Sequence, residues 1–119
     1  MEKFDFEKLE VYKKSIEFIG RVSDITEKLP YGIQKSLGDN LLRAAMSIAS
    51  NIAEGSGRRS RKEKRHHFEI SQGSAFECVP TLTILYGKKH ISEERYNELY
   101  SECLAISKMI SGLISHFSY

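Results

Sequence analysis

Apolar residues recur along most of this chain at steps of three and four positions, the spacing that places side chains on one face of an α-helix. Four segments carry the pattern, and we expect helices over about residues 7–29, 33–55, 60–87 and 92–117. The repeat is cleanest in the last segment, through Tyr96, Leu99, Cys103, Ile106, Ile110, Leu113 and Phe117. No segment alternates over a useful length with the two-residue period of a strand. The sequence therefore predicts an all-α fold.

Local signals mark where these helices begin and end. Pro30 is expected to end the first helix. Gly55 and Gly57 are expected to end the second and Gly87 the third, because glycine tolerates the backbone conformation that closes a helix. Pro80 falls inside the third segment and is expected to kink it, since proline has no N–H donor and crowds the preceding turn.

Two serines are expected to cap helices. Ser60 is followed three residues later by Glu63, the capping-box pattern in which each side chain satisfies a free backbone N–H of the other residue. Ser92 is the expected cap of the fourth helix. Helices of similar length joined by short connections favour an antiparallel up-down-up-down four-helix bundle, and we expect residues 1–119 to form this single domain.

The same spacing predicts which faces of the first two helices enter the core. In the first helix the expected stripe is Leu9, Tyr12, Ile16, Ile19, Val22, Ile25 and Leu29. In the second helix it is Leu37, Leu41, Ala44 or Ala45, Ile48 and Ile52.

The second helix carries an additional apolar stripe beside its core face. This stripe comprises Leu42, Met46, Ala49 and Ala53, so the apolar arc is wider than one core face requires. Asn51 lies seven residues after Ala44 and is expected to face inward. Two interpretations follow: a close-packed central helix with a satisfied amide, or a helix whose flank packs on another subunit.

Composition limits the class of protein. The chain has 119 residues, enough for one domain with its own core. No apolar run approaches the ~20 residues of a membrane span, and the acidic opening segment does not resemble a secretory signal. Two cysteines are too few for a disulfide framework. We therefore expect a cytoplasmic protein.

Positive charge is concentrated between residues 58 and 67. The cluster holds six of the eighteen Lys and Arg residues but one of the sixteen acids, so the remaining chain has a net charge of −3 although the whole chain has +2. Cations in a first helical turn oppose the helix dipole by roughly 0.3 kcal/mol or more each. Free backbone N–H groups at a helix start add to such charge and favour phosphate binding. The candidate nucleic-acid-binding residues, called the basic cluster below, are Arg58, Arg59, Arg61, Lys62, Lys64 and Arg65.

The alternative is a solvated basic end that serves solubility. Phe68 is the only aromatic residue near the cluster in sequence and is expected in the core, so base stacking has little support.

Enzymatic chemistry has weak support in this sequence. Glu63-x-x-His66 has the spacing of a di-iron ligand pair, but such a site needs a second copy of the motif and two more inward glutamates. Cys78 has no third residue to orient a histidine beside it. We therefore expect a protein that is not an enzyme and has no metal or cofactor.

The segment SIASNIAEGSGRRSRKE resembles the signature of the "four helix bundle protein" family, also called the large-subunit ribosomal RNA intervening-sequence proteins. Arg43-Ala44-Ala45 precedes it and Gly73-Ser74 follows it. The opening pattern Phe6-x-x-Leu9-x-Val11-Tyr12-x-Lys14 also resembles that family. By this similarity the core of the family motif corresponds to Arg43, Asn51, Glu54 and Gly55, and its basic tail to Arg58, Arg59 and Arg61 or Lys62.

The resemblance implies a four-helix bundle that often forms a ring-like homopentamer. It also implies relatedness to the accessory variability protein of diversity-generating retroelements, which binds nucleic acid and works with a reverse transcriptase. Two hypotheses follow. The chain is either an oligomer that binds RNA or DNA through the basic cluster, or a structural adaptor bundle that binds a protein partner.

Overall fold

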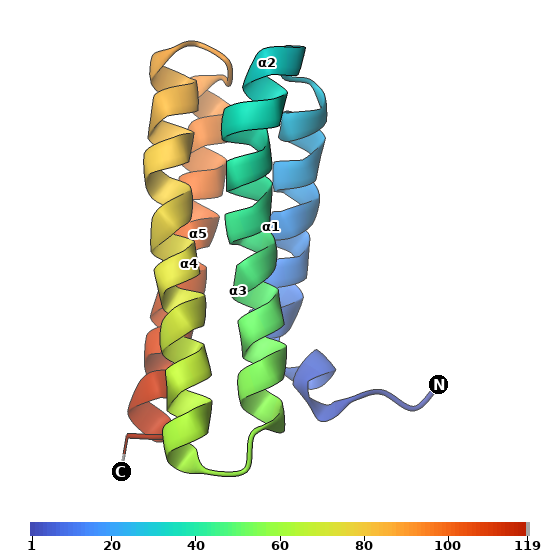
Figure 1. Ribbon diagram of the computed structural model, residues 1–119, viewed down its shortest axis with the longest axis vertical. Helices are drawn as coiled ribbons and strands as arrows, with labels where there is room; N and C mark the ends of the chain where they lie inside the picture. Colours follow the sequence, from blue (N-terminus) through green and yellow to red (C-terminus); the bar gives the residue numbers. More distant parts are fainter. Residues whose placement is uncertain (119) are drawn as a thin grey trace.

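The computed structural model describes residues 1–118, and within them four long helices form a bundle with a longest dimension of 44 Å. These helices are α1 (Glu10–Glu27), α3 (Asp39–Gly57), α4 (Arg61–Gly87) and α5 (Glu93–His116). Figure 1 shows successive long helices running in opposite directions along the bundle. No strand occurs in the described residues. The predicted all-α four-helix bundle is confirmed.

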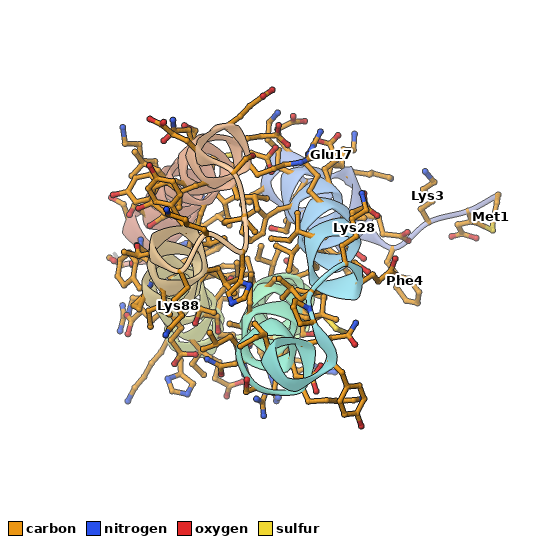
Figure 2. All side chains as sticks on the ribbon, turned by 90° about the horizontal axis from the view of Figure 1, so that it is seen from above. Met1, Lys3, Phe4, Glu17, Lys28 and Lys88 are labelled. Atoms are coloured by element: carbon orange, nitrogen blue, oxygen red, sulfur yellow. The ribbon has the colours of Figure 1, made fainter. Side chains whose placement is uncertain are left out.

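The helices occupy the corners of a square when the bundle is viewed from above (Figure 2). Helix α3 packs against α1 and α4, and α5 packs against α4 and α1. The α3–α4 contact is the most extensive of these, and it carries both the polar network and the basic cluster described below.

Short elements precede α1 and α3. A 3₁₀ turn covers Asp5–Lys8, so the regular helix begins later than residue 7. Helix α2 (Tyr31–Ile33) leads through a π-helical turn (Gln34–Gly38) into α3 without a break. Pro30 therefore follows the end of α1 and is also the N-cap of α2. The second helical stretch thus starts two residues before the predicted boundary.

Both predicted serine caps are present. The Ser60 side-chain oxygen accepts a hydrogen bond from the Glu63 backbone N–H at 3.0 Å, and that of Ser92 accepts from Arg95 at 3.1 Å. Helix α4 is continuous through Pro80, which lies on its exposed face.

Glycine plays a different part from the predicted one at Gly55. Helix α3 continues past it to Gly57, and no glycine in the described chain has a positive φ. A Cβ atom at Gly55 would lie 2.8 Å from the Phe68 ring and 3.0 Å from Cβ of His67. The prediction that Gly55 ends the helix is therefore wrong: its lack of a side chain allows α3 and α4 to approach closely.

The predicted core is confirmed in α3 and α5 and shifted in α1. Phe18 is fully buried, whereas Ile16 is 46% exposed, so the expected face of α1 is wrong in its first half. The buried stripe runs through Val11, Ser15 and Phe18 to Val22. Ser15 can be buried because its hydroxyl donates to the Val11 carbonyl at 2.7 Å.

Both cysteines are buried in the core as free thiols. Cys103 donates to the Ala75 carbonyl across the α4–α5 contact, with 3.1 Å between sulfur and oxygen. A hydrogen bond with Cys103 and burial raise the pKa of the Cys78 thiol. Cys78 is therefore protonated at neutral pH and acts as an apolar packing residue.

None of the helices in residues 1–118 is both long enough and apolar enough to cross a membrane.

Candidate nucleic-acid interface

The basic cluster lies at the end of the bundle where α3 turns into α4 (Figure 1). Ser60 caps the helix, so Arg61 is its first residue and four of the six cations fall within the first turn and a half. Arg58 and Arg59 lie in the connection before the cap. The six cations therefore share one end of the molecule.

Three members of the cluster face the C-terminal turn of α5, and we call them the inner cations: Arg61, Lys64 and Arg65. The Arg61 guanidinium donates to the His116 carbonyl, and that of Arg65 donates to the Ser118 carbonyl at 3.4 Å. Arg61 and Lys64 also lie over the Phe117 ring, 5.3 and 5.7 Å from its centroid. Carbonyl groups at a helix C-terminus carry partial negative charge. These three cations thus stabilise the end of α5.

The other three members, the outer cations Arg58, Arg59 and Lys62, do not contact α5 in this way. Arg58 forms an ion pair with Glu54 one turn earlier on α3. Arg59 and Lys62 are exposed and have no ion-pair partner in the described part of the chain. Positive charge on this side is therefore largely uncompensated.

The outer side of the cluster is hollowed into an open depression of about 510 Å³. Its lining residues are Arg58, Ser60, Lys62, Glu63, His66 and His67. The depression combines two cations, two imidazoles and a single carboxylate at a helix N-terminus, a setting that suits an oxyanion such as phosphate.

A polar network holds the start of α4 against α3. The Asn51 amide donates to the Ser47 carbonyl at 3.0 Å and to its hydroxyl at 3.1 Å. Asn51 Oδ1 lies 3.3 Å from Nδ1 of His67, and the hydroxyls of Ser47 and Ser74 lie 2.8 Å apart. Asn51 is half-buried between the two helices, as the interpretation of a satisfied inward amide predicts. The network positions His67 and with it the basic turn.

The four residues of the family motif do not form one site. Asn51, Glu54 and Gly55 meet α4 or its preceding connection beside the basic cluster. Arg43 is exposed on α3 and lies fifteen residues before Arg58, which is about 22 Å along a helix at 1.5 Å per residue. Arg43 is therefore separate from the cluster.

Sequence reasoning missed an aromatic cavity of about 190 Å³ beside the inner cations. It is lined by Asp5, Phe6, Leu9, Ser56, Lys64, Phe68, Leu113 and Phe117. Phe68 is buried as expected, but two aromatic residues that are far from the cluster in sequence, Phe6 and Phe117, lie near it in space. Phe6 and Phe117 are distant in sequence and line the same cavity because the start of α1 and the end of α5 both lie beside the start of α4. The signal available in the sequence was that Phe6 lies just before the first predicted helix and Phe117 lies at the end of the last one.

No three His, Cys, Asp or Glu side chains among residues 1–118 converge in a way that could hold a metal ion.

Comparison with a solved structure supports the fold. The chain is similar to a crystal structure of a protein of unknown function from the S23 ribosomal protein family of Bacteroides thetaiotaomicron, with a TM-score of 0.80 and 27% sequence identity. The similarity covers 87% of this chain and 97% of the other. No curated protein matches the sequence.

A family model supports the resemblance inferred from the motif. The model of the 23S rRNA-intervening sequence protein matches residues 7–112, which include all four long helices except the last turn of α5. The match also contains the motif residues Arg43, Asn51, Glu54 and Gly55 and the whole basic cluster. The chain therefore belongs to the 23S rRNA-intervening sequence protein family.

Proposed function

We propose that this protein is a non-enzymatic, oligomeric bundle that binds the phosphates of RNA or DNA at the start of α4. The observation that carries the proposal is an open depression lined by Arg58 and Lys62. Lys62 and the neighbouring Arg59 are exposed and have no ion-pair partner among residues 1–118. Outside residues 58–67 the chain has a net charge of −3, so a polyanion would be attracted to this end of the molecule.

The proposal includes self-association, and the family resemblance favours a homopentamer. Exposed apolar side chains occur on two different sides of the bundle. Phe76 and Leu104, 58% and 48% exposed, lie on α4 and α5, whereas Ile16 and Met46 lie on α1 and α3. Contacts between unlike surfaces of identical subunits generate closed rings when the rotation closes. In a ring of bundles lying side by side, the outer cations of all copies would share one rim.

The family name refers to 23S rRNA, which makes structured ribosomal RNA the first nucleic acid to test. A reverse transcriptase or another protein is a further candidate partner by the family resemblance. The proposed location is the cytoplasm, in keeping with two buried free thiols.

The test is a titration of labelled structured RNA and of a DNA duplex at several salt concentrations. Three phosphates neutralised on duplex DNA give a log–log salt slope of about −2.7. The triple variant Arg58→Ala, Arg59→Ala, Lys62→Ala is expected to remove this dependence. A variant with Lys28, Lys88 and Lys89 replaced by alanine removes the same charge at the opposite end of the bundle, where Figure 2 places Lys28 and Lys88. Equal losses in both variants would mean that only net charge matters.

Self-association has its own test. Light scattering of the purified chain at micromolar concentration is expected to give a multimer, most consistent with five copies. A monomer would remove the ring from the proposal and leave phosphate binding by single bundles.

An adaptor bundle that binds a protein is the second candidate, and the exposed face of α4 and α5 favours it. Phe76, Val79, Tyr100 and Leu104 line a groove of about 190 Å³ between these helices. Aromatic residues are enriched at protein interfaces. Co-purification after nuclease treatment separates the candidates, because a protein bound to this groove would stay bound when nucleic acid is digested.

A further inference from the structure

The aromatic cavity beside the inner cations is suited to a flat apolar ligand. The rings of Phe6, Phe68 and Phe117 contribute to its wall together with two leucines, and it measures about 190 Å³. An apolar cavity of about 150 Å³ is enough to hold benzene. The cavity therefore has room for one small ring system.

Aromatic contacts extend from the cavity toward solvent. The Phe68 and Phe117 ring centroids lie 5.8 Å apart, and the Phe6 ring stacks with Phe4 at 5.6 Å. Phe4 is 73% exposed, and Figure 2 shows it on the segment that projects from the side of the bundle. A planar group entering the cavity would meet aromatic surface, and one of the rings that line it, Phe6, is backed by the exposed ring of Phe4.

Cations stand at the border of the same cavity. Lys64 is one of its lining residues and lies 5.7 Å from the Phe117 centroid, while Arg61 lies over the same ring at 5.3 Å. The Lys64 ammonium donates to the Ser56 carbonyl at 2.9 Å, which uses one of its three donors. The carboxylate of Asp5, also on the lining, lies 3.8 Å from the ammonium of Lys8, which offsets its charge. The border can therefore attract a phosphate.

We propose that this cavity holds an unpaired base of single-stranded RNA or DNA whose phosphates lie on the basic cluster. This inference rests on the proposed phosphate binding and adds that the preferred ligand has a base free to leave its stack. Every base has an aromatic face, so stacking on phenylalanine would tolerate many sequences. A duplex, whose bases are paired and stacked, would use the outer cations without filling the cavity.

The competing occupant is an apolar side chain from a second copy of the chain. A side chain would use the cavity but would have no need for the cations beside it. The combination of a ring-sized apolar space and adjacent positive charge matches a nucleotide, which carries both a planar base and an anionic phosphate.

The test compares two short single strands of equal length and charge, one with bases and one with abasic positions throughout. Stacking on an aromatic side chain is expected to make the strand with bases bind roughly 5- to 150-fold more tightly. A 2-aminopurine placed in the first strand should change its fluorescence when it leaves the stack of neighbouring bases and enters the cavity. The chain has no tryptophan, so this signal is measured without background from that residue.

Variants locate the effect. Phe117→Leu and Phe6→Leu keep apolar packing but remove the ring, and each is expected to reduce the difference between the two strands while the abasic strand binds as before. Leu113→Phe fills the cavity without removing any ring and should have the same effect. Tyr31→Leu removes an exposed ring from α2, at the opposite end of the bundle (Figure 1), and serves as the matched control. Helicity measured by circular dichroism checks that each variant is folded.

Equal affinity for the two strands, with unchanged 2-aminopurine fluorescence, would overturn the base site and leave phosphate binding intact. Equal affinity with a lower oligomeric state in the Phe117 and Leu113 variants would assign the cavity to a second copy instead. Failure of both strands to bind at low salt would overturn phosphate binding as well, so the two proposals fail in distinguishable ways.

Discussion

The two ends of helix α4 carry similar side chains in opposite electrostatic settings. Four cations occupy its first turn and a half, and Lys88 and Lys89 follow its last residue. A helix has partial positive charge at its N-terminus and partial negative charge at its C-terminus. The lysines after the C-terminus therefore stabilise the helix, whereas the cations at its start oppose the dipole. Helix stability therefore explains the position of Lys88 and Lys89. It does not explain why the basic cluster lies at the start of α4.

Half of that explanation comes from a neighbouring helix. The inner cations, on α4, lie against the C-terminal turn of α5. Arg61 and Arg65 donate to its carbonyls, and Arg61 lies over the Phe117 ring. Among residues 1–118, the Arg58–Glu54 pair is the one ion pair that the outer cations form. A phosphate ligand would neutralise charge at such an unfavourable position. The comparison therefore shows that the inner cations have a structural role at the end of α5, whereas the position of Arg59 and Lys62 is not explained by an ion pair within residues 1–118.

The largest expected effect concerns the packing that holds the start of α4. Gly55→Ala places a methyl group 2.8 Å from the Phe68 ring at a buried site, and we expect it to lower the free energy of unfolding by about 1–3 kcal/mol in urea denaturation. Gly57→Ala is the matched control, since nothing lies within 4 Å of an added Cβ there and alanine favours the helix. Equal stability of the two variants would show that the close approach of α3 and α4 is not required.

The second prediction concerns the contact of the inner cations with the C-terminal turn of α5. The double variant Arg61→Ala, Arg65→Ala removes donors to the His116 and Ser118 carbonyls, and we expect it to lower the free energy of unfolding by about 1–2 kcal/mol. The double variant Arg59→Ala, Lys62→Ala removes the same charge and is expected to cost nothing. Equal losses would mean that the division into inner and outer cations has no energetic meaning.

The third prediction concerns the opposite end of α4. Lys89 adopts a left-handed conformation with φ of 63°, and it is flanked by hydrogen bonds that close the helix, from the His90 N–H to the Leu85 carbonyl at 2.8 Å and from the Lys89 N–H to the Tyr86 carbonyl at 2.9 Å. Glycine is the preferred residue at this position. Lys89→Gly is therefore expected to raise the free energy of unfolding by about 1 kcal/mol. Lys88→Gly, at a position with φ of −88°, should bring no such gain.

The sequence was sufficient for features that depend on neighbouring residues. The caps at Ser60 and Ser92 and the core stripe of α5 follow from spacing alone, because each is decided within a few turns of one helix. The stripe of α1 was misplaced because Ser15 looks polar in sequence but satisfies its hydroxyl within the helix. This hydrogen bond is local, and it was missed because a pattern that counts every serine as polar does not allow for a hydroxyl bonded to the carbonyl four residues earlier.

Features that depend on how helices meet could not be predicted. Gly55 was interpreted as a helix end because its contact with Phe68 exists only after α3 and α4 pack. The six cations were treated as one surface because the carbonyls that receive Arg61 and Arg65 lie more than fifty residues away. The aromatic cavity was missed for the same reason, since Phe6 and Phe117 come from opposite ends of the chain.

The smallest expected effect tests the functional side of the comparison. Lys62 lies in the first turn of α4 without an ion-pair partner among the described residues, so Lys62→Ala should raise the free energy of unfolding by about 0.3 kcal/mol through relief of the helix dipole. The gain should shrink as salt screens the dipole. The same variant is expected to weaken nucleic-acid binding and to reduce the salt slope by about 0.9. If Lys62→Ala stabilises the fold but weakens binding, ligand binding explains why a lysine stands at this position. If the variant loses stability instead, Lys62 is a structural cation.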